Sequence, residues 1–413
     1  MNAQERLRRK RKKQMQRRLS ILVPLAVIIL LIGGLTAGGI ILSVNQTKKA
    51  GTSQGGSSEV VKNDDGNKGG SDERETPSAD ENQTPEASTE EITTEEQTQP
   101  PADDELFDTM LAQIRGKVAE DKTWLTAANS EFETIRQQLL AIDSSALTEE
   151  MSDLYDVLTD YMAIEAEGAA YKDFVIPSGQ RACDVTGGVA YYEYLLRKMT
   201  GTDYDVQTIH DKIANELNAT HGTVTSLLGA DPMLTQKSSS LTKESAPDSY
   251  KFTNVTNVSD SLKAAYVCSG LKNGWAEFGL LRAYLLDGAL DSSVKNYLVE
   301  TSRMTYAMYG LLDYYVHHDG WTQAQVTELC VRYFGGDQTE LAATVYNLIL
   351  QNPGSYVAAA LGYIEIASIE SKLAQGVSGY SEQTLLDFLF ARGPASFRVY
   401  HKWADEMVAV PAV

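Results

Sequence analysis

Apolar residues recur at helical spacing through most of the chain that follows residue 102. Period-two alternation of apolar and polar residues, which would indicate strands, is hard to find there. The pattern therefore predicts an all-α, multi-helix globular domain over residues 103–413. Two stretches show the helical stripe most clearly, one with Phe132, Ile135, Leu139 and Ile142, the other with Val189, Tyr192, Leu196 and Met199.

Residues that favour helix starts and stops lie at the breaks between the predicted helices. Thr322 and Gln325 form a capping-box pattern, and Asn352-Pro353-Gly354 and Gly393-Pro394 each favour the end of one helix and the start of another. Helices are predicted over 131–142, 147–170, 187–199, 204–228, 258–288, 292–318, 322–334, 338–351, 355–375, 381–391 and 395–407.

The segment 231–258 interrupts this pattern. It is polar, and we expect a loop there that holds at most one short strand, at Tyr250–Thr253. Loops of this length inside compact domains are often functional or disordered.

The N-terminal region predicts a membrane anchor. Residues 1–18 contain nine Lys and Arg against one acid, and an uncharged apolar run follows within 19–44. About 24 helical residues span about 36 Å, enough to cross a hydrocarbon core of ~30 Å. The basic tail should stay in the cytoplasm, which places the rest of the chain outside a single-pass cell membrane. A cleavable signal peptide is the alternative, although its apolar core would be shorter.

Residues 45–102 are rich in Gly, Ser, Thr, Pro and acids and contain no aromatic residue. Such a segment buries too little apolar surface to offset its chain entropy, so we expect a disordered acidic linker. The formal net charge of the chain is −20. This charge disfavours nucleic acid as a partner, and it names no ligand by itself.

Cysteine and histidine provide no recognisable metal motif. Cys183, Cys268 and Cys330 are widely spaced, and we expect them to be small buried residues. The five histidines include no His-Glu-x-x-His or His-x-His pattern. We therefore expect no bound metal and no other cofactor.

One local pattern suggests chemistry. Asp313 and His317 are four residues apart, hence neighbours on one face of a predicted helix. A carboxylate at this spacing can fix an imidazole tautomer for a catalytic role, but a buried hydrogen-bonded pair that orients a helix end is the more common case. Tyrosine is abundant, 21 residues against nine Phe. Such a composition suits a core in which the tyrosine rings are buried and some of their hydroxyl groups reach a cleft.

Five stretches together resemble one bacterial family, the domain of unknown function 885, whose members look like helical zinc metallopeptidases. In chain order they are GGVAYYEYLLRKMTGTDYDVQTIH (187–210), NGWAEF (273–278), LLDYYVHHDGWT (311–322), NPGSYVAAALGYIE (352–365) and FLFARGPASF (388–397). The resemblance implies a zincin-like helical scaffold over roughly 130–407.

The same resemblance implies that the metal ligands are missing. The family's His-Glu segment would fall within 243–263, where this chain has no histidine. The acids that flank the family's Gly-Trp-Ala would correspond to Asn273 and Leu280, and Glu277 points in another direction around the helix. A Phe-His pair of the family corresponds to Leu385-Leu386.

We therefore expect a non-catalytic relative that binds a peptide or an envelope-protein partner. The alternative is a hydrolase at a non-standard site around Asp313 and His317, aided by Glu277 or Glu365; a purely structural role in the envelope is a third. The residues expected to line a ligand groove are Tyr191, Tyr192, Trp275, Asp313, His317, Trp321, Tyr356 and Tyr363.

Overall fold

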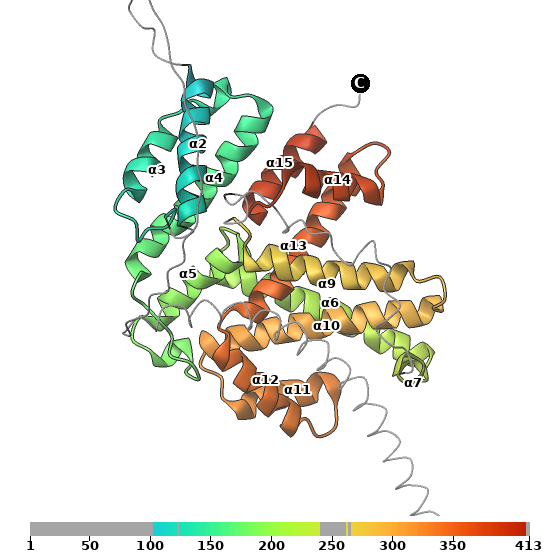
Figure 1. Cartoon of the computed structure of the whole chain (residues 1–413). Coiled ribbons are helices and arrows are strands. Elements are labelled where there is room, and N and C mark those ends of the chain that lie inside the picture. The colour runs from blue at the N-terminus through green and yellow to red at the C-terminus, as the bar shows by residue number, and fades with distance from the viewer. Residues whose placement is uncertain (1–101, 122–123, 240–261, 263–265, 410–413) are drawn as a thin grey trace, which may run out of the picture. The chain divides into compact units, whose positions relative to one another are not determined.

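The computed structural model describes residues 102–121, 124–239, 262 and 266–409. Within these ranges the chain forms thirteen α-helices and no strand, which confirms the predicted all-α class (Figure 1). None of these helices is both long and apolar enough to cross a membrane. The predicted membrane helix at 19–44, nearly all of the predicted linker and the strand predicted at Tyr250–Thr253 lie outside the described residues.

The α-helices are α2 (Asp103–Glu120), α3 (Phe132–Leu140), α4 (Glu149–Gly168), α5 (Gly188–Thr200), α6 (Val206–Ala230), α7 (Leu234–Ser239), α9 (Ser269–Leu286), α10 (Ser292–His317), α11 (Gln323–Phe334), α12 (Thr339–Gln351), α13 (Ser355–Gly376), α14 (Glu382–Arg392) and α15 (Phe397–Ala409). Short 3-10 helices are η2 (Ser144–Ala146), η3 (Ala169–Tyr171) and η4 (Ala182–Asp184).

Three elements differ from the sequence prediction. Helix α2 was not predicted, although its acidic first turn and its buried stripe are ordinary helix signals. Helix α7 lies in the segment predicted to be a loop. The helix predicted over 258–288 is not continuous, because residues 266–268 are not helical and α9 begins at Ser269.

Four helices form the centre of the domain. Helix α13 lies against both α9 and α10, and α6 lies against α10 on another side. Figure 1 shows α9, α6 and α10 running alongside one another. Because α10 is enclosed by these neighbours, nearly every side chain in its second half is buried, including the polar side chains of Asp313 and His317.

The α9–α13 crossing depends on glycines. A Cβ atom built on Gly274 would lie 2.5 Å from the backbone nitrogen of Tyr363 and closer still to the backbone of Gly362. A Cβ on Gly362 would collide with the backbone carbonyl of Gly270. The two helix backbones therefore touch directly, and only glycine, which has no Cβ atom, permits this approach.

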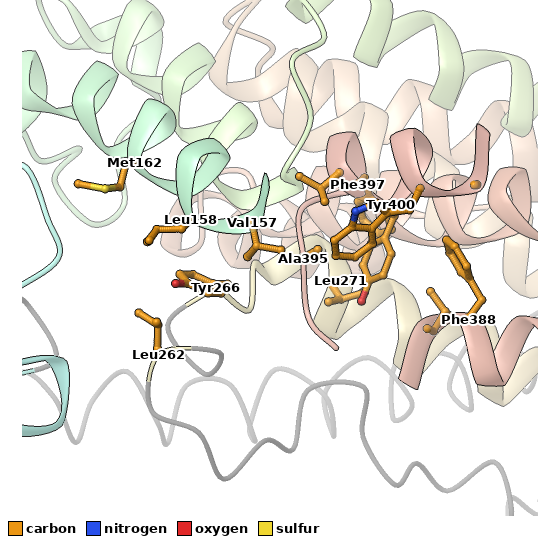
Figure 2. Packing of buried hydrophobic residues seen from close by; sticks show 14 of the residues in the cluster. Val157, Leu158, Met162, Leu262, Tyr266, Leu271, Phe388, Ala395, Phe397 and Tyr400 are labelled. Carbon is orange, nitrogen blue, oxygen red and sulfur yellow. The ribbon is translucent and has the colours of Figure 1, made fainter. Parts of the chain in front are cut away.

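The N-terminal helices share one hydrophobic core with α9 and α13–α15. Helix α2 contributes Phe107, Leu111, Ile114 and Val118 to this core. On the other side of α4, Val157 and Tyr266 connect it to Ala395, Phe397 and Tyr400 (Figure 2). Helix α4 is thus held between two groups of helices.

Candidate functional site

Asp313 lies at the centre of the residues singled out by the sequence. Its carboxylate is fully buried and accepts a hydrogen bond from the Tyr192 hydroxyl at 2.9 Å. It also accepts the backbone N–H groups of Gly354 and Tyr356, both at 3.0 Å, and that of Val357 at 3.4 Å. These amides lie at the start of α13, whose N-cap, Gly354, has no side chain to offer them. Asp313 therefore caps α13 from a different helix.

The surroundings of Asp313 leave no room for a substrate. A carboxylate has about four acceptor sites, and four donors already point at this one. Burial raises the pKa of Asp313, and the hydrogen bonds from the Gly354 amide and the Tyr192 hydroxyl, which lower it, do not overcome this effect. The negative charge also faces the positive end of the α13 dipole. All of these contacts are architectural.

His317 is fully buried too, and both ring nitrogens are occupied. Its Nδ1 accepts the backbone N–H of Ala182 at 3.1 Å, and its Nε2 donates to the Ile349 carbonyl at 3.0 Å. Since an amide can only donate and a carbonyl can only accept, these partners fix the neutral Nε2–H tautomer. Asp313 and His317 share a face of α10 as predicted, but within the described residues no hydrogen bond joins them. Each instead secures a different distant segment.

The other predicted groove residues lie in separate aromatic groups. Tyr191 packs on Phe174, with ring centroids 4.7 Å apart, and Trp321 stacks on Tyr315 at 4.2 Å. Trp275 stacks on Phe278, whose other neighbour is Tyr363. The structure therefore brings together four of the eight candidates, which are Tyr192, Asp313, His317 and Tyr356.

The positions at which the family resemblance would place metal ligands mostly hold side chains that cannot bind a metal. Asn273 and Leu280 are half-buried on α9, and Leu385 belongs to the hydrophobic core. Glu277 is buried beside Tyr306, whose pKa is raised by burial and by that neighbouring acid. The described part of the chain contains no group of three or more His, Cys, Asp or Glu arranged to hold a metal ion. Residues 243–261 and 263–265 lie outside it.

Glu365, the other acid of the hydrolase alternative, is part of a buried ionic cluster. Its Oε2 accepts from His401 Nε2 at 2.5 Å and from the Tyr204 hydroxyl at 3.2 Å, and Lys212 Nζ lies 3.1 Å from Oε1. Burial alone would raise the pKa of Glu365, but His401 and Lys212 reverse this and lower it. The cluster ties α6, α13 and α15 together.

The cysteines are free thiols, as expected, but only Cys330 is fully buried. Cys183 and Cys268 are half-buried, so the prediction of three buried cysteines is wrong for these two. The Cys268 sulfur accepts the Leu271 N–H at 3.4 Å at the start of α9, which gives this residue a capping role.

A cleft that the sequence did not indicate follows one face of α4. Three adjoining cavities of about 120, 200 and 130 Å³ line up along it. The first two share Val157 and Tyr266, and the second and third share Asp160, Ile164 and Gly201. We call these three cavities together the α4 cleft. None of the eight predicted groove residues lines it.

Ion pairs cross from α4 to the facing wall of this cleft. The facing bases come from α5, the next α-helix along the chain, and from α14 and α15, which are far from α4 in the sequence. The pairs are Asp153–Arg392 at 2.7 Å, Glu165–Lys198 at 2.5 Å, Asp160–Arg398 and Glu167–Arg197. A further pair, Asp156–Lys402 at 2.6 Å, joins α4 to α15 outside the three cavities. The acidic stripe of α4 is visible in the sequence, but nothing local indicates its partners.

Burial and pairing act against each other on these bases. Burial lowers the pKa of Lys198, but the charge of Glu165 outweighs this and the net direction is upward. At Arg398, burial lowers the pKa. The charged walls of the cleft are therefore partly desolvated, which strengthens their interaction with any charge that enters.

Comparison with known proteins gives little guidance. No family model matches the chain, and no curated protein matches it. Among solved structures, it is similar to a putative lipoprotein from Colwellia psychrerythraea, with 12% sequence identity and a TM-score of 0.42. That match covers 75% of this chain and 70% of the other. Similarity at this level assigns neither a family nor an activity.

Proposed function

We propose that this chain is a membrane-anchored, extracytoplasmic binding protein with the zincin-like helical scaffold of the domain of unknown function 885 family, but without its catalysis. The apolar run at 19–44 anchors it, with the N-terminus in the cytoplasm. The helical domain binds a peptide or an envelope protein.

The observation that carries this proposal is the state of Asp313 and His317. The two side chains best suited to chemistry are fully buried, and their hydrogen-bonding positions are taken by Tyr192 and by backbone groups. A general base must be within reach of a substrate proton, and these two are not.

The stretches that carry the family resemblance contact one another in the interior of the domain, through hydrogen bonds and close helix packing. Tyr192, Asp313 and Gly354 come from three of the five stretches and join in one hydrogen-bonded group. Gly274 and Gly362 come from two of them and form the α9–α13 crossing. These contacts support the proposal that the stretches serve as scaffold, while the resemblance implies that the family's chemistry comes from histidines and acids that this chain lacks.

The proposal predicts no peptide hydrolysis. The purified full-length chain in detergent micelles would be incubated with zinc and a mixed pool of eight-residue peptides, and the pool examined by mass spectrometry. A zinc metallopeptidase under the same conditions shows that the pool is cleavable. No cleavage above the protein-free control is expected. Cleavage that requires zinc and scales with the amount of the purified chain would overturn the proposal.

A further inference from the structure

The α4 cleft has the dimensions of a peptide site. Its lining follows α4 from Glu150 to Glu167. At ~1.5 Å per helical residue this face is about 26 Å long. An extended chain rises ~3.3 Å per residue, so about eight residues would span it.

The middle cavity suits one apolar side chain. Val157, Ile164, Leu195, Met199 and Tyr266 line it, and its volume is about 200 Å³. Figure 2 shows Val157 and Tyr266 within the buried cluster at this point. A dry cavity of ~150 Å³ is large enough to hold benzene. A Leu, Met or Phe side chain therefore fits here.

Two carboxylates in the middle cavity are buried with few partners. The side chains of Asp160 and Glu165 are only 6% and 7% exposed, and each is paired with one base that is 42% exposed. The Oδ1 of Asp160 pairs with Arg398 and the Oε1 of Glu165 with Lys198, and among the described residues neither carboxylate has a further partner. Buried carboxylates normally fill their acceptor sites. These two can still accept N–H donors from a ligand.

Charge defines the ligand further. Six acids and four bases line the three cavities. Each of the four bases is paired with an acid of α4. Glu150 and Asp203, exposed at opposite ends of the cleft, form no ion pair with any described residue. The cleft is thus net negative, with excess acid at both ends.

We infer that the α4 cleft binds an extended peptide of about eight residues with an apolar side chain near its centre and Lys or Arg toward both ends. The inference rests on the proposed binding function and names its site and ligand. Peptide N–H groups donate to Asp160 and Glu165, the apolar side chain fills the middle cavity, and the basic side chains meet Glu150 and Asp203.

Affinity selection from a pool of random eight-residue peptides tests this inference. The full-length chain in micelles would be incubated with the pool, and bound peptides identified by mass spectrometry. We expect peptides with a basic–apolar–basic pattern to be enriched. The best of them, made with a fluorescent label, would then serve as the probe for measuring the dissociation constant by anisotropy.

Variants locate the site. Asp160→Asn combined with Glu165→Gln should raise the dissociation constant of the probe at least about ten-fold, as expected when charge-assisted hydrogen bonds are lost. Asp156→Asn is the matched control, since Asp156 is an ion-paired acid of α4 that lines none of the cavities. It should change affinity less than about two-fold. If the buried variant does not fold, the exposed pair Glu150→Gln and Asp203→Asn should still weaken binding about three-fold.

The outcomes separate the two proposals. Enrichment of basic–apolar–basic peptides that is lost with the cleft variants supports the site and its ligand. Peptides that bind the cleft variants as tightly as the wild type, or an enriched set without basic residues, would overturn the inference and leave a binding function in place. If the wild type enriches no peptide, peptide binding itself is wrong.

Discussion

Replacing Asp313 by alanine should lower the free energy of unfolding by at least about 3 kcal/mol. The substitution leaves the Tyr192 hydroxyl and the buried N–H groups of Gly354 and Tyr356 without their acceptor. Each unsatisfied buried donor costs roughly 1–3 kcal/mol. Removing the carboxyl also relieves the cost of burying its charge, so the sum of the individual penalties is an upper bound. The free energy of unfolding of a native protein is about 5–15 kcal/mol in total, so the expected loss is a large part of it.

Urea denaturation followed by tryptophan fluorescence would measure this change. Glu328→Gln is the control, because Glu328 is an exposed acid on the next helix, and it should stay within ~0.5 kcal/mol of the wild type. If Asp313→Ala unfolds at the same urea concentration as Glu328→Gln, Asp313 does not hold α13 in place and its architectural role is wrong.

Replacing Gly274 by alanine is the second large expected effect. The added methyl group would collide with the backbone of Gly362 and Tyr363, and no side chain is available to move aside. Overpacking of a core usually costs ~1–3 kcal/mol, occasionally more, whereas alanine in a helix gains ~1 kcal/mol over glycine. Because the collision is between backbones, we expect a net loss of at least about 2 kcal/mol.

Gly116 provides the matched control. It is an exposed glycine within α2, and a Cβ atom there would meet nothing within 4 Å. Gly116→Ala should therefore stabilise the chain by up to ~1 kcal/mol through helix propensity alone. The same denaturation measurement would compare the two variants. Equal stability of Gly274→Ala and Gly116→Ala would show that α9 and α13 do not touch at this crossing.

Local signals in the sequence were enough to predict the fold class and most helices. The capping box at Thr322 and Gln325 is present as predicted, and the breaks at Asn352–Gly354 and Gly393–Pro394 separate helices as predicted. Such features depend on residues a few positions apart. Helix α2 was not predicted, although its buried residues Phe107, Leu111, Ile114 and Val118 follow the same helical spacing.

The site depends on contacts between distant parts of the chain, and these could not be predicted. Asp313 was singled out for a partner four residues away, yet its partners are 41 residues ahead and 121 residues behind. The acids of α4 are likewise visible as a stripe, but Asp153 meets Arg392 across 239 positions. A single sequence shows which side chains are polar. It does not show which of them face a cavity.

A zinc titration of the purified full-length chain by isothermal calorimetry, with metal content measured after dialysis, tests the proposed function most directly. Because the chain lacks the metal-binding residues of the family that it resembles, it should not bind zinc stoichiometrically with sub-micromolar affinity. One tightly held zinc ion per chain would contradict the proposal, and the protein would then have to be treated as a hydrolase.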